Sequence, residues 1–312
     1  MQNNNDNLST EAGFLFDQLR SRLTSSLLLS ADKPEETVKS TLRACWLAAA
    51  GNPKSAEEAL RHPITTLSKD QTQILEQLIG DRLAGKPLAY ITARQSFMGL
   101  ELISDKRALI PRKETEILGT QALDMSFQIA QAKKPVRVMD VCCGGGNLAL
   151  SIGYYNPNTL VFATDLSHES IALTNDNISH LKLGNRVTAE QGDLFSAFEN
   201  TEHYENTDVI ICNPPYISSA KVTKMDAEIS AHEPSMAFDG GMFGTNIIQK
   251  LILQSPKFLA QEGWLVFEVG AGQGDFIIRV CQNSGSYKIV ESVCDGLGNI
   301  RVVAAQKNKI DG

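Results

Sequence analysis

The segment Asn213-Pro214-Pro215-Tyr216 ends an apolar run and combines residue types that suit the binding of a planar amino group. Each proline fixes its own φ and disfavours the helical region for the residue before it, so we expect Asn213 and Pro214 to be extended. Neither proline has an N–H, and Asn213 adds a side-chain carbonyl to the backbone acceptors. Tyr216 offers a flat ring for stacking. These residues predict a site for an NH₂ group, although a proline-rich stop that merely ends a strand would use the same types.

A glycine-rich turn forms a second candidate site, in the segment that begins at Asp140 and contains Gly144-Gly145-Gly146. Successive glycines let the backbone approach a ligand closely and adopt positive φ before a helix begins near Asn147. The next predicted strand ends on Asp165, 25 residues after Asp140, where a carboxylate can accept two hydrogen bonds from a ribose diol. Asp193 has a comparable position after the third strand. Together these residues predict a nucleoside site at one edge of a sheet.

The ligand of this turn is predicted to be a cation without phosphates. The GxGxxG pattern is absent, since Gly146 is followed by Asn147-Leu148-Ala149, and no Walker lysine accompanies the turn. Several carboxylates with little positive charge suit S-adenosylmethionine, which carries a sulfonium and an ammonium. A tight turn without a ligand, or a helix cap, would also use a glycine run or a single acid, so the prediction depends on the whole set.

Strands alternate with helices beyond about residue 135, and these elements must position the candidate residues. Amphipathic helical patterns separate the earlier strands. The predicted strands are residues 136–141, 159–165, 186–193, 208–213, 263–270, 288–294 and 300–306. This alternation favours an α/β fold, a doubly wound, mostly parallel, seven-stranded Rossmann-like sheet covered on both faces. Ligands of such sheets bind at the carboxyl ends of the strands, where the candidate residues are located.

The first part of the chain is predicted to be helical. Apolar residues recur at helical spacing between about residues 9 and 85, with Ser68 a predicted N-cap and Gly51 and Gly85 predicted C-terminal stop residues.

A two-stranded hairpin is predicted next, at residues 96–112, because short apolar runs flank the polar turn Ser104-Asp105-Lys106. We place the main boundary near residue 111, with the hairpin as the bridge. The expected domains are an N-terminal helical substrate-recognition domain at 1–95, the hairpin at 96–112 and the strand-and-helix domain at 113–312.

Composition limits the classes of partner. A net charge of −7, from 29 basic and 36 acidic side chains, argues against bulk nucleic-acid binding. No run approaches the roughly 18 apolar residues of a membrane span, and no export signal is recognisable. The six cysteines lack CxxC spacing and the five histidines lack HxxxH or HExxH spacing, so we expect neither a metal nor a disulfide framework. A cytoplasmic monomer with no membrane partner is the expectation.

Four segments together resemble a known family: NPPY at 213–216, LIPRKETE at 109–116, HEPSMAFDGG at 232–241 and FEVGAGQG at 267–274. They are similar to those of the HemK family of S-adenosylmethionine-dependent protein-(glutamine) N-methyltransferases, which act on the Gly-Gly-Gln loop of peptide chain release factors. The resemblance covers nearly the whole chain. NPPY alone is shared with adenine N6 methyltransferases, and the other segments make the resemblance more specific.

The resemblance implies S-adenosyl-L-methionine as cofactor, S-adenosyl-L-homocysteine as product and a release factor as protein substrate. It implies that Asn213, Pro214, Pro215 and Tyr216 form the catalytic motif. The cofactor contacts that it implies follow the strand ends: Asp140, Cys142, Gly144, Gly146, Asp165, Leu166, Asp193, Leu194 and Asn213. The residues that it places at the substrate pocket are Phe97, Pro111, Arg112 and Tyr216.

Three segments depart from the family's pattern. The first glycine of D-x-G-x-G-x-G is Cys142 here, whose side chain would crowd the methionine tail of the cofactor. The family's YILG segment reads YITA at 90–93, and the second proline of IPRPETE is Lys113.

The predicted reaction is in-line methyl transfer to a planar amide nitrogen that Asn213 and Pro214 orient, with no general base required before transfer. Three alternatives remain open. Methylation of a nucleobase amino group is disfavoured by the acidic balance, and methylation of another peptide or a specialised metabolite is kept open by Thr92, Ala93 and Lys113. A cofactor-binding relative that does not catalyse is disfavoured by the intact NPPY.

Overall fold

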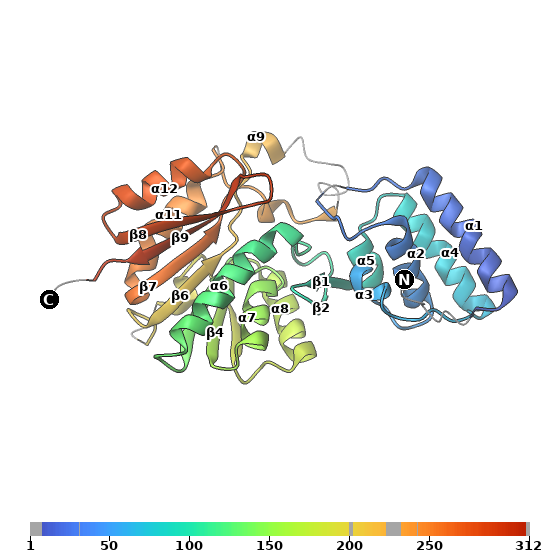
Figure 1. Cartoon of the computed structure of the whole chain (residues 1–312), viewed down its shortest axis with the longest axis horizontal. Helices are drawn as coiled ribbons and strands as arrows, with labels where there is room; N and C mark the ends of the chain where they lie inside the picture. The colour runs from blue at the N-terminus through green and yellow to red at the C-terminus, as the bar shows by residue number, and fades with distance from the viewer. Residues whose placement is uncertain (1–7, 31, 200–201, 223–231, 242, 310–312) are drawn as a thin grey trace. The chain divides into compact units, whose positions relative to one another are not determined.

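The computed structural model describes residues 8–30, 32–199, 202–222, 232–241 and 243–309, which divide into two compact units (Figure 1). The first unit comprises Met1–Lys106, Ile110–Lys113 and Asp226–Glu233. The second comprises Arg107–Leu109, Glu114–Met225 and Pro234–Gly312. The chain therefore passes between the units more than once, which a simple linear boundary does not capture.

The first unit is mainly helical, as predicted. Its helices are α1 (Thr10–Ser26), α2 (Val38–Ala49), α3 (Ala56–Ala59), α4 (Lys69–Leu83) and α5 (Leu88–Thr92). Leu23, Trp46 and Leu75 are among the buried residues of its core. Ser68 is confirmed as an N-cap, because its hydroxyl accepts a hydrogen bond from the Gln71 amide. Gly51 and Gly85 follow α2 and α4 with φ of 84° and 94°, the left-handed conformation that favours glycine at these ends.

The hairpin of this unit is shorter than the predicted 96–112 and turns elsewhere. Its strands are β1 (Arg94–Phe97) and β2 (Leu100–Ile103), paired antiparallel with Phe97 opposite Leu100. The turn is Met98-Gly99, where both residues have positive φ, rather than the polar segment 104–106. Two-residue hairpin turns need this backbone geometry, and an apolar Met at the first position concealed the turn within the apolar run.

The second unit is built on a seven-stranded sheet. Its strands are β3 (Val136–Val141), β4 (Thr159–Asp165), β5 (Val187–Gln191), β6 (Thr207–Cys212), β7 (Leu259–Glu268), β8 (Tyr287–Cys294) and β9 (Ile300–Lys307). Its α-helices are α6 (Glu116–Ile129), α7 (Asn147–Tyr155), α8 (His168–Leu181), α9 (Ser219–Val222), α11 (Asn246–Gln254) and α12 (Gly274–Asn283). The 3₁₀ helices of the chain are η1 (Lys113–Thr115), η2 (Ser196–Phe198), η3 (Ser235–Ala237) and η4 (Ser255–Lys257).

The strand order is β5-β4-β3-β6-β7-β9-β8, and β9 is antiparallel to both of its neighbours. All seven predicted strands are confirmed, with β7 beginning at Leu259 rather than 263. Helices α11 and α12 contribute Ile248, Leu251 and Ile277 to the core on one face, while α6 and α7 contact the strands from the other side (Figure 1). The fold is therefore the predicted doubly wound, mostly parallel α/β sheet.

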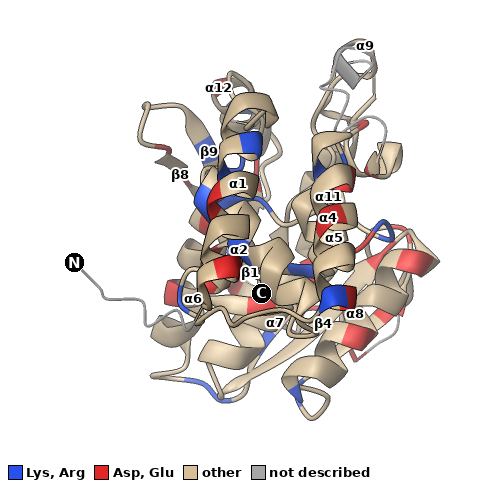
Figure 2. Cartoon of the chain, turned by 90° about the vertical axis from the view of Figure 1, so that its right-hand side faces the viewer, with Lys and Arg blue, Asp and Glu red and all other residues tan. Residues whose placement is uncertain are grey.

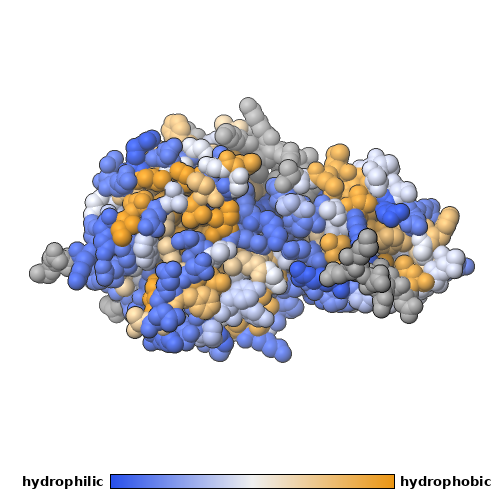
Figure 3. All heavy atoms as spheres, viewed as in Figure 1, coloured by the Kyte–Doolittle hydropathy of each residue, from blue (hydrophilic) through white to orange (hydrophobic). Residues whose placement is uncertain are grey.

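The surface of the described residues is mixed in character. Acidic and basic residues both occur along α1 in Figure 2. Hydrophilic and hydrophobic residues alternate in small areas over the face that Figure 3 shows. None of the helices within the described ranges is long and apolar enough to cross a membrane.

Candidate active site

The sheet register brings the two predicted sites to one edge. Strand β3 lies between β4 and β6, with Val141 opposite both Thr164 and Cys212. Asp165 ends β4, the glycine turn follows β3 and Asn213 follows β6, so all three lie at the carboxyl ends of adjacent parallel strands. This is the position at which open α/β sheets bind ligands.

Hydrogen bonds and close packing fix the glycine turn. The Gly144 amide donates to Oδ2 of Asp165 at 2.9 Å, and Oδ1 of Asp165 accepts from the Ser167 amide at 2.9 Å. Gly146 has φ of 84° at the start of α7, and a Cβ there would lie 2.8 Å from Cγ2 of Thr174. By contrast, a Cβ on Gly144 would meet no atom within 4 Å. The turn is thus tightly packed at Gly146 and open at Gly144.

Asp140 is the most deeply buried acid of this region. Its side chain is 0% exposed, and Oδ2 accepts a hydrogen bond from the Ala149 amide at 2.9 Å. Oδ1 has no hydrogen-bond partner among the residues that the structure describes. The pKa of Asp140 is raised from 3.8 to about 8. Burial is the main cause, the nearby Asp165 acts in the same direction, and the hydrogen bond from the Ala149 amide acts against both. A ligand cation next to this carboxyl would supply the missing partner, which fits the ammonium of S-adenosylmethionine.

Cys142 occupies the position of the family's glycine with φ of 61°. A left-handed conformation costs an ordinary residue about 1–2 kcal/mol, which explains why glycine suits this position. Its side chain is half-buried and packs against the core cluster that contains Cys212. The neighbouring Cys143 is buried, and burial raises its pKa well above its ordinary value, so its thiol stays protonated.

The remaining predicted cofactor residues are less enclosed. Leu166 is 53% exposed. Asp193 is exposed, and its amide donates to Oγ of Ser196 at 2.7 Å. Leu194 is buried with φ of 52°. All three follow β4 or β5 at the same carboxyl edge as Asp140.

The NPPY segment presents two acceptors. Nδ2 of Asn213 donates to Oγ1 of Thr115 at 3.1 Å. Neither Oδ1 of Asn213 nor the carbonyl of Pro214 accepts a hydrogen bond from any residue within the described ranges. Two oxygens of consecutive residues are therefore left to accept hydrogen bonds from a ligand.

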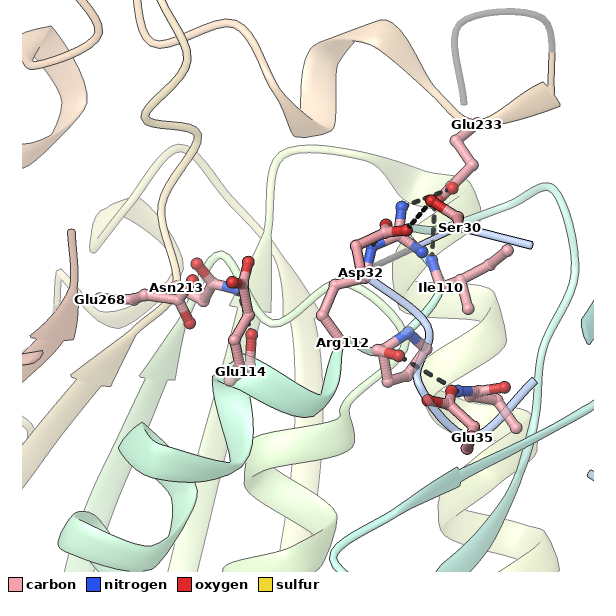
Figure 4. Close-up of polar contacts among 12 residues, drawn as sticks. Ser30, Asp32, Glu35, Ile110, Arg112, Glu114, Asn213, Glu233 and Glu268 are labelled. Carbon is pink, nitrogen blue, oxygen red and sulfur yellow. Dashed lines mark hydrogen bonds and ion pairs between the residues drawn. The ribbon is translucent and has the colours of Figure 1, made fainter. Parts of the chain in front are cut away.

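A charged cluster anchors Tyr216. Its hydroxyl donates to Oε1 of Glu268 at 2.8 Å, and Nη2 of Arg301 lies 3.3 Å from the same oxygen and 3.0 Å from Oε2 of Glu114. Burial raises the pKa of Glu268, while the hydroxyls of Thr115 and Tyr216 act in the opposite direction. Burial and the two carboxylates raise the pKa of Tyr216 well above its ordinary value, so its hydroxyl remains a donor. Figure 4 shows Glu114, Asn213 and Glu268 gathered in this cluster.

Two glycines in and just after the HEPSMAFDGG segment pack against the NPPY backbone. A Cβ on Gly240 would lie 2.6 Å from the Pro215 carbonyl oxygen, and one on Gly244 would lie 2.2 Å from that of Tyr216. Nε2 of Gln273 donates to the Tyr216 carbonyl at 3.0 Å. The sequences around HEPSMAFDGG and FEVGAGQG are thus explained by contact with the loop that carries Asn213.

The predicted substrate-side residues Phe97, Pro111 and Arg112 belong to the first unit. Phe97 is fully buried in β1, and the Pro111 carbonyl accepts from Nε2 of Gln95 at 3.3 Å. Nη2 of Arg112 lies 2.6 Å from Oε1 of the fully buried Glu233 carboxylate, as Figure 4 shows. Burial alone would lower the pKa of Arg112, but Glu233 and Asp32 raise it. Pro111 and Arg112 therefore make contacts within the first unit, and Phe97 is packed inside the protein.

Sequence reasoning missed four residues that lie around the NPPY segment: Thr115, Glu268, Gln273 and Arg301. The first three lie within the segments LIPRKETE and FEVGAGQG, so the signal was present but carried no assigned role. Arg301 lies in a β-branched strand without any motif, and only the sheet pairing of β9 with β7 reveals its position.

The sheet order with one antiparallel strand, and a glycine turn flanked by carboxylates without a phosphate-binding lysine, define an S-adenosylmethionine-dependent methyltransferase. Comparisons agree with this class. Residues 118–243 match the model of the methyltransferase small domain, and residues 7–92 match that of the PrmC N-terminal domain. The hMettl16 catalytic domain, solved in complex with MAT2A 3′UTR hairpin 6, shares the fold with a TM-score of 0.53 and 16% identity, covering 72% of this chain and 81% of that one.

Sequence relatives narrow the class. The release factor glutamine methyltransferase of Thermodesulfovibrio yellowstonii is 32% identical over 243 residues, which cover 78% of this chain and 84% of that protein. The ribosomal protein uL3 glutamine methyltransferase of Bradyrhizobium diazoefficiens is 32% identical over 225 residues, covering 69% of this chain and 67% of that protein. The chain belongs to the release factor glutamine methyltransferase family.

Asp140 should make the cofactor-free protein less stable as the pH rises. The folded carboxyl, with its pKa of about 8, keeps a proton that the unfolded chain releases near pH 4, so stability is lost as the pH rises between these values. The isosteric Asp140→Asn variant keeps an acceptor for Ala149 but cannot ionise. In urea titrations between about pH 5 and about pH 7.5, the wild-type midpoint should fall more steeply than that of the variant. Parallel pH profiles would show that Asp140 is already ionised in the fold.

Removing the Glu233 carboxylate should destabilise the first unit. Glu233→Ala leaves the buried Arg112 guanidinium without its main partner, a change that costs about 3–5 kcal/mol. Trp46 fluorescence in a Trp264→Phe background reports unfolding of this unit, because the chain has two tryptophans, one in each unit.

The matched control is Lys113→Ala, which breaks a pair with Glu57 whose side chains are 29% and 30% exposed. It should cost less than about 1 kcal/mol. Equal effects of Glu233→Ala and Lys113→Ala on the urea midpoint would contradict the structural role of the buried pair.

Proposed function

We propose that the chain methylates the glutamine side chain of the Gly-Gly-Gln motif of a peptide chain release factor. The observation that carries the proposal is the pair of unpaired acceptors, Oδ1 of Asn213 and the Pro214 carbonyl, at the carboxyl edge of a methyltransferase sheet. A primary amide has two N–H groups to match them. The names of the relatives support glutamine as the acceptor residue.

The residues that would hold S-adenosyl-L-methionine surround the glycine turn. Asp140 would face the cofactor's ammonium, Asp165 would accept from the ribose through the remaining lone pairs of its oxygens, and Gly144 and Gly146 would admit the ligand to the backbone. The other proposed contacts are Cys142, Leu166, Asp193, Leu194 and Asn213. The bound cofactor supplies an electrophilic methyl group on a sulfonium and leaves as S-adenosyl-L-homocysteine.

The acceptor pair would act on the reactivity of the substrate nitrogen. An amide nitrogen is a poor nucleophile, because its lone pair is delocalised into the carbonyl. Hydrogen bonds from its N–H groups to Asn213 and Pro214 orient the nitrogen and stabilise the positive charge that develops on it. Positioning of this kind contributes on the order of 7 kcal/mol or more in favourable cases. The cationic product then loses its proton without a dedicated base, while Pro215 stiffens the loop and Tyr216 flanks the amide.

Recognition of the substrate protein is assigned to the first unit. Residues 7–92, which match the PrmC N-terminal domain, would recognise the body of the release factor, and Phe97, Pro111 and Arg112 would border the glutamine. The proposal keeps the division expected from the sequence, with a recognition domain at 1–95, a bridge at 96–112 and a methyltransferase domain at 113–312. A release factor substrate also implies action in the cytoplasm, by a monomer that binds one substrate molecule.

A second candidate substrate is the glutamine of ribosomal protein uL3. The Bradyrhizobium uL3 glutamine methyltransferase and the Thermodesulfovibrio release factor glutamine methyltransferase are each 32% identical to this chain. The match to the uL3 enzyme covers a smaller share of both proteins. The chemistry at the NPPY segment would be the same for both substrates, so only the recognition of the surrounding protein separates them.

Asn213→Ala should lower kcat for release factor methylation by about 100-fold or more, because it removes one of the two acceptors. Transfer of radiolabelled methyl groups to purified release factor and to uL3 measures both candidate activities at once. Cofactor affinity, measured by calorimetry, should change much less than kcat, because Asn213 is one of several proposed cofactor contacts and the Asp140 side of the site is untouched.

The control is Asn175→Ala, an exposed asparagine of α8 that should leave activity unchanged. Near-normal methylation by Asn213→Ala would refute the assigned role. Methylation of uL3 alone would replace the release factor as the substrate.

A further inference from the structure

The two prolines of the NPPY segment limit where the protein can hold it. Pro214 and Pro215 have no N–H, so the middle of the segment cannot donate a backbone hydrogen bond. The Pro214 carbonyl accepts none from the residues in the described ranges. Polar side chains occur only at the two ends, on Asn213 and Tyr216. The position of the two acceptors therefore depends on how these ends are held.

Both ends have polar partners within the second unit. At the first end, Nδ2 of Asn213 donates to Oγ1 of Thr115 at 3.1 Å. At the other end, the Tyr216 hydroxyl donates to Oε1 of Glu268 at 2.8 Å. These partners lie in η1 and β7, which are far apart in the sequence. The two ends keep their spacing only if η1 and β7 are themselves held together.

Arg301 links these two elements through a single nitrogen atom. Its Nη2 lies 3.0 Å from Oε2 of Glu114, the residue before Thr115 in η1. The same Nη2 lies 3.3 Å from Oε1 of Glu268 and 3.4 Å from the hydroxyl oxygen of Tyr216. Its Nε has no hydrogen-bond partner among the described residues. One guanidinium nitrogen thus contacts the partners of both ends of the NPPY segment.

The backbone of Arg301 is fixed by the sheet. The residue is 9% exposed and belongs to β9, where the next residue, Val302, lies opposite Glu268 of β7. Its carbonyl accepts a hydrogen bond from the Val269 amide at 2.9 Å. A side chain that starts from a paired strand is placed more precisely than one that starts from a loop. The guanidinium is therefore a rigid support at the carboxyl edge of the sheet.

We infer that Arg301 is a positioning residue that fixes both ends of the NPPY segment and thereby the two acceptors for the substrate amide. This inference rests on the proposed function and deepens it. Through Glu114 the guanidinium holds the 3₁₀ turn that carries Thr115, and it contacts Tyr216 directly. Methyl transfer requires the substrate nitrogen to lie in line with the methyl group, and a displacement of about 1 Å can lower the rate about 100-fold.

The test uses variants of Arg301 and Glu114 and a matched control on the same strand. Arg301→Met removes the charge, whereas Arg301→Lys keeps it and offers three N–H donors to the three oxygens that Nη2 contacts. Glu114→Gln changes a partner whose side chain is 41% exposed. The control is Lys307→Met, which removes another buried cation from β9. Its Nζ lies 3.0 Å from Oε1 of Glu205, at the end of the strand away from Arg301.

The measured quantities are kcat and KM for purified release factor, with the urea midpoint as a measure of stability. Arg301→Met should lower kcat by about 10- to 100-fold with KM within about threefold, because the surfaces that bind the substrate protein are unchanged. Arg301→Lys should keep kcat within about threefold of the wild type, because only one nitrogen of the guanidinium is used. Lys307→Met should lower the urea midpoint, as Arg301→Met does, but leave kcat at the wild-type value.

A double variant tests whether Glu114 and Arg301 act together. Glu114→Gln alone should lower kcat by about 3- to 10-fold, and by less than about twofold when Arg301 is already Met, because residues that act through one contact are not additive. Calorimetry should show the affinity for S-adenosyl-L-methionine within about threefold of the wild type in every variant, since the Asp140 side of the site is unchanged.

Wild-type kcat in Arg301→Met or in Glu114→Gln would overturn the inference. Equal losses of kcat in Arg301→Met and Lys307→Met would also contradict it, since they would reflect lost stability alone, as would multiplicative effects in the double variant. If Arg301→Met does not fold, kcat and KM of the exposed Glu114→Gln change decide the question. Failure of the wild type to methylate release factor or uL3 would instead overturn the proposed function, and the inference with it.

Discussion

The arrangement around the NPPY segment depends on two oxygen acceptors that the protein holds in place but leaves without hydrogen-bond partners. Oδ1 of Asn213 and the Pro214 carbonyl follow β6 directly, and no described residue donates to either. Leaving such groups unpaired is unfavourable, by about 1–3 kcal/mol each where they are removed from water. The surrounding structure must therefore prevent the loop from relaxing toward other donors. Most of the contacts around NPPY serve this constraint.

Rigid support reaches the loop from three sides. Gly240 and Gly244 approach the Pro215 and Tyr216 carbonyls so closely that a Cβ at either position would clash with the backbone. Gln273 donates to the Tyr216 carbonyl from the start of α12. These contacts explain the glycines at 240 and 244, where backbone approaches backbone, and the amide at 273, which donates to a backbone carbonyl.

The sequence was sufficient for the elements whose pattern is local and insufficient for those set by tertiary contact. Continuous β-branched runs predicted all seven strands, and the structure brings the segments 144–146 and 213–216 to the same carboxyl edge of the sheet, as predicted. The hairpin turn at Met98-Gly99 was missed, because an apolar residue with positive φ has no distinctive signal. The roles of Thr115 and Arg301 depend on which strands and helices become neighbours, and no local pattern encodes that pairing.

Two buried carboxylates of the site differ in how their charge is compensated. Glu268 accepts a hydrogen bond from a tyrosine hydroxyl at 2.8 Å and lies 3.3 Å from a guanidinium, although its Oε2 has no hydrogen-bond partner among the described residues and burial raises its pKa. Asp140 receives one backbone amide and keeps an unpaired oxygen in a fully buried position. An unpaired buried carboxyl destabilises the folded protein when no ligand is bound. A cation that binds beside it supplies the missing interaction and so stabilises the folded state. Side chains of the protein therefore compensate the charge of Glu268 in part, whereas Asp140 has a single backbone amide and would gain more from a cation that binds beside it.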